Sequence, residues 1–283
     1  MKITLANDSA CAEIYPELGA LCASLKIKDR ELLAWPSGFD PENYKKISGG
    51  LPLLFPITGR LSRQGEMGKY LHQGNLFELG IHGFLHTQTF EILSQDSQSL
   101  SLKLKNNLDT FKNYPFEFEI ILNFKLLKNG LEINQIYKNL GVNPMPFYAG
   151  FHPYFYISRD RSGAKLNFKA IKSFQYNELL TEVIGEQACL DMPIDLANPS
   201  YNERLSLLGS DPKDKTVRLK FKDGSELIQA SDFEYLQLYT DFQKEFICLE
   251  PWMSHPNSFN SLLAVKIIQA GESWKSRYWV VLD

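Results

Sequence analysis

FEFEIILNFKLLKNGLEINQIYKNL, residues 116–140, is the stretch that decides the fold class of this chain. Apolar and polar residues alternate on both sides of Lys128-Asn129-Gly130, and this period of two is typical of strands that bury one face. A short turn containing Asn-Gly between two such runs predicts a hairpin. The stretch therefore predicts antiparallel β-structure.

Short runs of the same character recur over the whole chain, without a fixed-period repeat or a low-complexity tract. Helical character is confined to residues 174–185, with a shorter candidate at 109–116. We therefore expect an all-β sandwich that forms a single domain over residues 1–283, with the loop-rich stretch 194–215 as an excursion from it. The other expected strands lie at residues 22–27, 76–93, 99–105, 147–157, 216–221, 234–240, 245–252, 262–270 and 276–282.

The composition narrows the class of partner. Apolar residues make up 44% and charged residues 22% of the 283 residues, and a net charge of −3 gives no general attraction to a polyanion. We expect a small neutral ligand, and neither nucleic acid nor membrane as a partner. The chain has no signal-peptide pattern and no run approaching the ~20 apolar residues that span a bilayer, which predicts a cytoplasmic protein. Cys11, Cys22, Cys189 and Cys248 show no Cys-x-x-Cys spacing, so we expect four buried, reduced thiols.

The segment FYAGFHPYFYI, residues 147–157, contains the first candidate for chemistry. As a strand it would place His152 on one face with Tyr148, Tyr154 and Tyr156, opposite an apolar face. Pro153 removes a ladder donor, which predicts an edge strand or a kink at His152. An imidazole among hydroxyl groups can carry a proton near neutral pH. The alternative is a structural histidine that completes a hydrogen-bond network.

The segment EFICLEPW, residues 245–252, contains the second candidate. Alternation places Glu250 on the same apolar, aromatic face as Trp252. Burial raises the pKa of a carboxyl group and makes it a better proton acceptor at neutral pH, while an indole offers a plane for the C–H face of a sugar. Pro251 predicts a strand end that opens into a cleft. The alternative is a glutamate at a strand end that points into water.

His82 and His86, in GIHGFLHTQTFEI (residues 80–92), have the spacing of a helical zinc motif. The zinc protease motif requires Glu directly after the first histidine, whereas Gly83 follows here in a strand-like context. On a strand the two side chains would stand ~13 Å apart, too far to chelate one ion. We therefore expect no metal site at this pair, and Gly83 would let the backbone or a ligand come close to His82.

Arg60 ends GGLPLLFPITGR, residues 49–60, in which glycines and prolines surround an apolar run. This pattern predicts a shaped loop. A guanidinium there could donate several fixed hydrogen bonds to adjacent sugar hydroxyls, in a geometry that lysine cannot match. The alternative is a solvated arginine that pairs with Glu66 or with no partner.

Taken in order, GRLSR, IHGF, FYAGFHPYFYI and LEPW resemble the aldose 1-epimerase family, the galactose mutarotase-like proteins. The resemblance extends from about residue 12 to about residue 280 and includes the ending KIIQAGESWKSRYWVV. FP-x-x-GRL and EPW are most similar to the bacterial branch found beside lactose and tagatose genes.

The resemblance implies a large twisted antiparallel β-sandwich, no cofactor, and exchange of the α and β anomers of a hexose such as galactose or glucose. By matching motif positions, Glu250 would take the proton from the C1 hydroxyl and His152 would deliver one to the ring oxygen. His82 would assist at the ring oxygen or hold the sugar, and Arg60, Trp252 and Tyr154 would bind the sugar. The resemblance is compatible with either a monomer or a homodimer.

Some positions depart from the family pattern or leave alternatives open. Gly59 stands where galactose mutarotases carry Asn before the arginine, and the substrate-binding aspartate would be Asp191 or Asp195. A hexose-6-phosphate 1-epimerase would need converging positive charge, for which the candidates are Arg60, Arg63, Lys45, Lys46 and Lys69. A non-catalytic carbohydrate-binding protein on the same scaffold is a further alternative.

Overall fold

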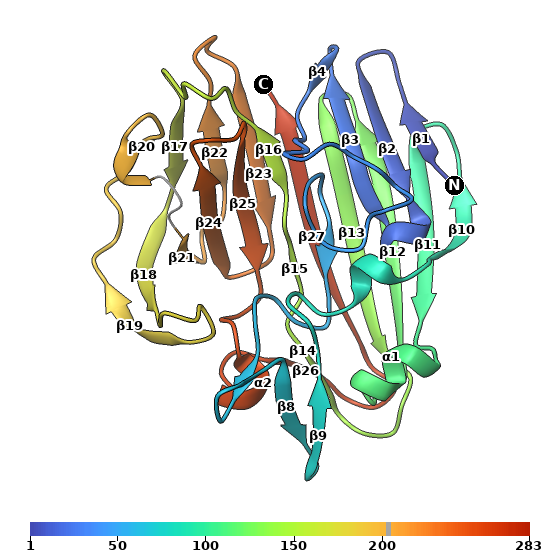
Figure 1. The fold of residues 1–283 in the computed structure, drawn as a ribbon. Coiled ribbons are helices and arrows are strands. Elements are labelled where there is room, and N and C mark those ends of the chain that lie inside the picture. Colours follow the sequence, from blue (N-terminus) through green and yellow to red (C-terminus); the bar gives the residue numbers. More distant parts are fainter. Residues whose placement is uncertain (202–204) are drawn as a thin grey trace.

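The computed structural model describes residues 1–201 and 205–283, and its largest element is a nine-stranded antiparallel sheet (Figure 1). The hairpin predicted at residues 116–140 lies within it and is confirmed. The register pairs Leu127 with Gly130, which leaves Lys128 and Asn129 as the loop. In order across the sheet, the strands are β10 (Glu91–Gln95), β11 (Ser99–Lys105), β12 (Phe118–Leu127), β13 (Gly130–Asn139), β27 (Ser273–Leu282), β23 (Glu226–Ser231), β22 (Val217–Lys220), β17 (Lys165–Phe168) and β20 (Ile194–Asp195).

Two further sheets lie side by side in front of the large sheet in Figure 1. One has four strands: β1 (Ile3–Ala6), β2 (Ala10–Tyr15), β3 (Leu21–Ile27) and β4 (Arg30–Glu31). The other has eight: β19 (Val183–Gln187), β18 (Ala170–Tyr176), β21 (Leu205–Ser210), β24 (Tyr235–Asp241), β25 (Phe246–Trp252), β15 (Gly150–Phe151) and β5 (Leu53–Leu54), with β16 (Tyr154–Tyr156) also paired to β25.

The layers pack through apolar side chains and form the predicted all-β sandwich. Strands β2 and β3 contact β12 and β13, and the ring of Phe151 stacks on that of Tyr278 with centroids 4.3 Å apart. Buried polar groups between layers are also paired, since the Gln229 amide donates to the Leu249 carbonyl oxygen over 2.7 Å. This packing holds β25, which carries Glu250, against the nine-stranded sheet.

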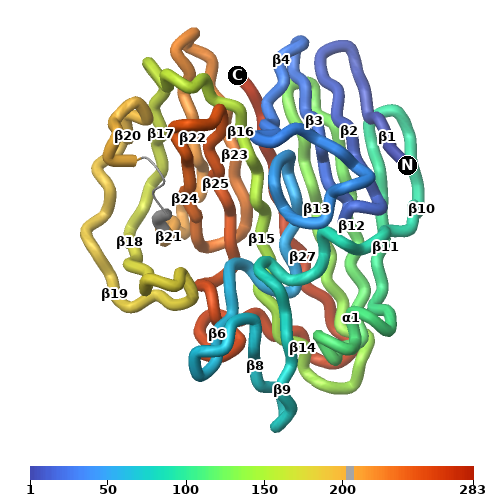
Figure 2. The backbone as a smooth tube through the Cα atoms, in the orientation of Figure 1, coloured from blue at the N-terminus to red at the C-terminus, as the bar shows by residue number. Residues whose placement is uncertain are grey.

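Short elements gather at the lower end of the molecule in Figures 1 and 2. The predicted helix near 109–116 is confirmed as α1 (Leu108–Asn113), which the side chain of Asn107 caps. No helix of the described residues is long and apolar enough to cross a membrane. The other short elements are β6 (Ser62–Arg63), β7 (Glu66–Met67), β8 (Lys69–His72), β9 (Asn75–Glu78), β14 (Met145–Phe147), β26 (Lys266–Ile268), α2 (Ser258–Ser261), and the 3-10 helices η1 (Pro16–Leu18), η2 (Leu85–Thr87) and η3 (Pro199–Tyr201).

The helix predicted at residues 174–185 is wrong, because this segment is the β18–β19 hairpin. Its turn is closed by Asn177, whose side-chain oxygen accepts hydrogen bonds from the backbone N–H groups of Thr181 and Glu182. Such local bonds compete with a helix, and pairing of β18 with β21 extends the sheet instead. A hairpin therefore replaces the predicted helix.

The continuous strand predicted at residues 76–93 is also wrong. Strand β9 ends at Glu78, His82 has a positive φ of 63°, η2 follows, and β10 begins only at Glu91. The expected excursion at residues 194–215 contains β20, η3 and β21, while residues 202–204 lie outside the described part. The expectation of four buried thiols needs correction as well, because Cys189 is exposed and Cys11 is partly exposed, although all four are free.

Candidate active site

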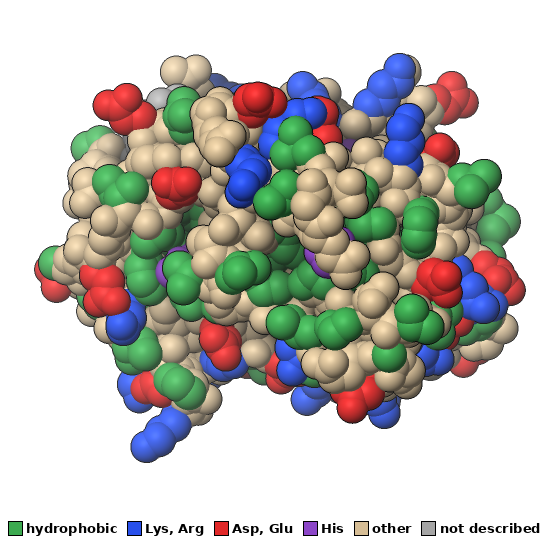
Figure 3. Space-filling model, turned by 90° about the horizontal axis from the view of Figure 1, so that it is seen from below, with side chains coloured by type: hydrophobic (Ala, Val, Ile, Leu, Met, Phe, Trp, Pro, Cys, Tyr) green, Lys and Arg blue, Asp and Glu red, His purple; other side chains and the backbone are tan. Residues whose placement is uncertain are grey.

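A cavity of about 310 Å³ opens among β24, β25, the β15–β16 junction and the loops at the lower end of the molecule. Seen from below, this end shows hydrophobic side chains around partly covered histidines (Figure 3). The volume is at the small end of the range for ligand sites, about 300–1,000 Å³. The lining residues are Gly59, Arg60, Ile81, His82, His152, Tyr176, Leu180, Gln237, Tyr239, Glu250, Trp252 and Pro256.

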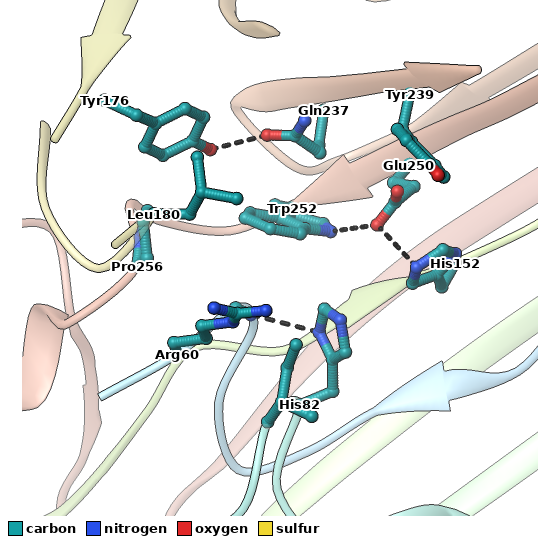
Figure 4. Close-up of a pocket in the computed structure, with 12 residues that line it drawn as sticks. Arg60, His82, His152, Tyr176, Leu180, Gln237, Tyr239, Glu250, Trp252 and Pro256 are labelled. Carbon is teal, nitrogen blue, oxygen red and sulfur yellow. Dashed lines mark hydrogen bonds and ion pairs between the residues drawn. The ribbon is translucent and has the colours of Figure 1, made fainter. Parts of the chain in front are cut away.

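Glu250 and Trp252 project from the same face of β25 into the cavity (Figure 4). Only 2% of Glu250 is exposed, and the indole N–H of Trp252 donates to its Oε2 over 3.1 Å. Burial raises the pKa of Glu250 well above its usual value, although the hydrogen bond from Trp252 acts in the opposite direction. The strand ends at Trp252, as Pro251 predicted, and Glu250 does not point into open water.

His152 lies in the break between β15 and β16, and its Nε2 is 3.4 Å from Oε2 of Glu250. The predicted kink at Pro153 is thus confirmed, but β15 is not an edge strand, since it pairs with both β25 and β5. Burial lowers the pKa of His152 to about 3. Because burial raises one pKa and lowers the other, it favours an uncharged pair with a single proton on the carboxyl group.

Tyr154 does not line the cavity, which corrects its expected role as a sugar contact. Its ring lies parallel to that of His152, with centroids 4.7 Å apart and an interplanar angle of 5°. The role of Tyr154 was expected from the resemblance alone, and in the structure β15 and β16 are separated at His152. Tyr154 therefore supports the imidazole from behind.

His82 reaches the cavity from the loop before η2, where two hydrogen bonds tie it to Gly59. Its backbone N–H donates to the Gly59 carbonyl oxygen over 2.9 Å, and its Nδ1 accepts from the Gly59 N–H over 3.0 Å. Burial lowers the pKa of His82 well below its usual value, so the ring is neutral and its proton is on Nε2. His82 is therefore a fixed hydrogen-bond donor, 5.2 Å from the His152 ring between centroids.

Glycines give this loop its shape, as the sequence suggested. Gly83 has a φ of +74°, and a Cβ there would lie 2.3 Å from the Phe55 carbonyl oxygen. Gly59, with a φ of +71°, faces Pro256, whose Cβ would be 2.9 Å from an added Cβ. A side chain at position 59 would thus be strained and crowded, which accounts for glycine where Asn was expected from the resemblance.

Arg60 lines the cavity beside Gly59, and its Nη1 donates to the Leu179 carbonyl oxygen over 3.3 Å. This contact with the β18–β19 turn replaces the pairing with Glu66 considered from the sequence. Among the described lining residues, Arg60 is the single lysine or arginine. Arg63, Lys45, Lys46 and Lys69 do not line the cavity, so the positive charge that a sugar phosphate needs does not converge there.

Sequence reasoning missed the polar residues that β18 and β24 contribute. Gln237 is paired with Glu250 in the register of β24 and β25, and the Tyr176 hydroxyl donates to its side-chain oxygen. The alternation Tyr-x-Gln-x-Tyr at 235–239 marks a polar face and could have indicated Gln237. Neither Asp191 nor Asp195 lines the cavity, so the expected binding aspartate is absent among the described lining residues.

His82 and His86 were predicted to lie on one strand, ~13 Å apart, and therefore not to share a metal ion. The reason given from the sequence was wrong, because the pair lies in a turn and a 3-10 helix rather than on a strand. One group does have the composition of a metal site: His152, Cys248 and Glu250.

The fold and the cavity define an all-β protein with a buried carboxyl–imidazole pair at the base of a pocket sized for one small ligand. The chain belongs to the aldose 1-epimerase family, whose model matches residues 1–280. It is 27% identical over 276 residues to Protein LacX, chromosomal, from Lactococcus lactis subsp. lactis, covering 89% of this chain and 87% of that protein. The resemblance inferred from the motifs is thereby confirmed.

Solved structures show the same fold. Slr1438 protein from Synechocystis sp. PCC 6803 is 26% identical with a TM-score of 0.85, covering 100% of this chain and 96% of that one. Galactose 1-epimerase from Lactobacillus acidophilus NCFM is 16% identical with a TM-score of 0.79, covering 100% and 94%. The galactose mutarotase-like sandwich is thus the fold of this chain.

Proposed function

We propose that this protein is an aldose 1-epimerase that interconverts the α and β anomers of a hexose. The observation that carries the proposal is the pairing of Glu250 and His152, 3.4 Å apart at the base of a monosaccharide-sized cavity. Opening a hemiacetal ring requires one base and one acid acting on different oxygens, and this pair can supply both. Family membership supports the same reaction class.

The pair shares one proton through the reaction. Burial favours the neutral form, with that proton on Glu250. When a sugar binds, its C1 hydroxyl and the Trp252 N–H both donate to the carboxylate, which stabilises the charged form and transfers the proton to His152. Glu250 then removes the proton of the C1 hydroxyl while His152 protonates the ring oxygen. Rotation about C1–C2 and the reverse transfers yield the other anomer.

The remaining lining residues bind and orient the sugar. His82 donates from Nε2 toward the ring oxygen, since its other nitrogen accepts the Gly59 N–H. Arg60 donates to hydroxyl groups at the mouth of the cavity, and Trp252 covers the apolar C–H face of the ring. No step requires a cofactor. The single lining arginine supports a free hexose such as galactose or glucose over a sugar phosphate.

The test follows optical rotation after α-D-galactose or α-D-glucose is dissolved with catalytic amounts of protein. Glu250→Gln keeps the size of the side chain and removes the base, so the acceleration over water should fall by about 10²–10⁴-fold. Glu245→Gln, at an exposed position one residue before β25, is the matched control and should leave the rate unchanged. Retained acceleration in Glu250→Gln would reject the base assignment.

Two further measurements distinguish the proposed enzyme from a hexose-6-phosphate epimerase and from a carbohydrate-binding protein. The same assay with glucose 6-phosphate should give a much lower kcat/KM than with the free hexose, and the reverse order would indicate a hexose-6-phosphate epimerase. If the wild-type protein binds hexoses in calorimetry but accelerates neither reaction, the chain is a carbohydrate-binding protein on an enzyme scaffold.

A further inference from the structure

Three side chains of different chemistry meet beside the cavity, which His152 and Glu250 line and Cys248 does not. One potential ligand atom from each of His152, Cys248 and Glu250 lies within 4.8 Å of the other two, and all three residues are buried. Cys248 and Glu250 are two positions apart and share one face of β25, and His152 approaches from the β15–β16 junction. The Nδ1 atom of His152 has no hydrogen-bond partner.

We propose that His152, Cys248 and Glu250 form a binding site for Zn²⁺, and that the bound ion inhibits the enzyme. Thiolate, imidazole and carboxylate are all ligands that zinc accepts. Tetrahedral bonds of zinc to S, N and O place the ligand atoms about 3.3–3.7 Å apart. Oε2 of Glu250 and Nε2 of His152 already have this separation, at 3.4 Å. The largest distance within the group must shrink by little more than about 1 Å, which side-chain rotation supplies.

Charge balance favours zinc in this buried place. Before binding, Cys248 carries its proton and the Glu250–His152 pair shares one, so the group is neutral. Binding of Zn²⁺ releases both protons and leaves one thiolate, one carboxylate and one neutral imidazole around a doubly charged ion. The group is again neutral, so no net charge is transferred into the low-dielectric interior. Mg²⁺ and Ca²⁺ prefer sets of oxygen ligands and should bind poorly.

The position of the site explains why binding would inhibit. Three protein ligands leave the fourth position of zinc open, and Glu250 and His152 both line the cavity, so that position faces the sugar site. The ion would occupy the lone pairs that accept and deliver protons in the proposed reaction. Inhibition therefore rests on the proposed function, whereas zinc binding itself does not.

Metal binding is tested first, without sugar. The protein is used without a histidine tag and with Cys189→Ser, because the exposed Cys189 thiol could bind zinc by itself. Calorimetry in buffers of different ionisation enthalpy should show one Zn²⁺ per chain and release of about two protons. Co²⁺ in place of Zn²⁺ should show a thiolate charge-transfer band. Cys248→Ala and Cys248→Ser should lose the band and weaken Zn²⁺ binding by more than about 10-fold. Cys22→Ala, at another buried free thiol, should change neither.

Inhibition is then measured by polarimetry with Zn²⁺, Mg²⁺ and a chelator. Zn²⁺ should raise the apparent KM for the hexose, the chelator should restore activity, and Mg²⁺ should have no effect. Cys248→Ala should retain the zinc-free rate and lose its sensitivity to zinc. Equal sensitivity in Cys248→Ala and Cys22→Ala, or no binding of Zn²⁺ or Co²⁺, would overturn the proposal. If metal binds as described but the protein has no epimerase activity, the proposed function fails and the metal site stands.

Discussion

Replacing Trp252 with phenylalanine isolates the hydrogen bond that stabilises the charged form of Glu250. Phenylalanine keeps an aromatic plane in the cavity but removes the N–H that donates to Oε2 over 3.1 Å. A hydrogen bond to a charged group contributes about 1.5–3 kcal/mol. Since the bond lowers the pKa of Glu250, its loss should raise that pKa further.

The free energy lost with this hydrogen bond should also lower the catalytic rate. Less of the bound enzyme would hold a charged carboxylate, so kcat should fall by about 10–150-fold, with a smaller change in KM. The alkaline limb of the pH–rate profile, where the pair loses its last proton, should move to higher pH. Trp35→Phe is the matched control, because the Trp35 indole donates to the Ala23 carbonyl oxygen outside the cavity.

Polarimetry over a range of pH measures both effects, with thermal unfolding as the check on folding. An unchanged kcat in Trp252→Phe would refute the idea that this bond stabilises the catalytic carboxylate. A rise in KM without a change in kcat would indicate that Trp252 only stacks on the sugar.

Three further predictions concern proton transfer, binding and stability. Because burial lowers the pKa of His152 to about 3, kcat/KM should stay constant between about pH 7 and pH 5. It should fall only as the pH approaches that pKa, where a second proton binds to the Glu250–His152 pair. Loss of activity near an ordinary histidine pKa, about 6.5, would contradict this. Arg60→Lys should raise KM about 5–10-fold with little change in kcat, since a lysine cannot donate to two hydroxyls in the same fixed geometry; an unchanged KM would exclude Arg60 from the sugar site. Gly83→Ala should lower the free energy of unfolding in urea by about 2–4 kcal/mol, from the positive φ and the contact with the Phe55 carbonyl oxygen. Gly224→Ala, with a φ of +87° and nothing within 4 Å of an added Cβ, should show the smaller cost of φ alone.

Local patterns in the sequence were enough to predict several of the strands and the chemistry of single residues. Alternation of apolar and polar residues around Lys128-Asn129 predicted the hairpin of β12 and β13, because period-two burial is a property of each strand by itself. A carboxylate on an apolar face at Glu250 indicated a raised pKa in the same way. These features depend on neighbours in the chain, which the sequence contains directly.

Local patterns misled where two structures could satisfy them. Residues 174–185 were predicted to be helical, yet they form a hairpin because β18 pairs with β21 and Asn177 closes the turn. Tyr154 was expected from the resemblance to bind the sugar, but its ring packs parallel to the His152 imidazole and does not line the cavity. In both cases contacts from outside the segment decided the outcome.

The sequence identified the two residues of the proposed acid–base pair, but it could not show that they lie close together. Glu250 and His152 are nearly one hundred positions apart, and their separation of 3.4 Å results from the antiparallel pairing of β15 and β16 with β25. The register of β24 with β25 brings Gln237 beside Glu250, and Asp191 and Asp195 lie outside the cavity. The sequence by itself determined the sandwich and the types of group available for catalysis. Tertiary structure decided which groups face one cavity, because pairing between distant strands depends on packing that no local pattern records.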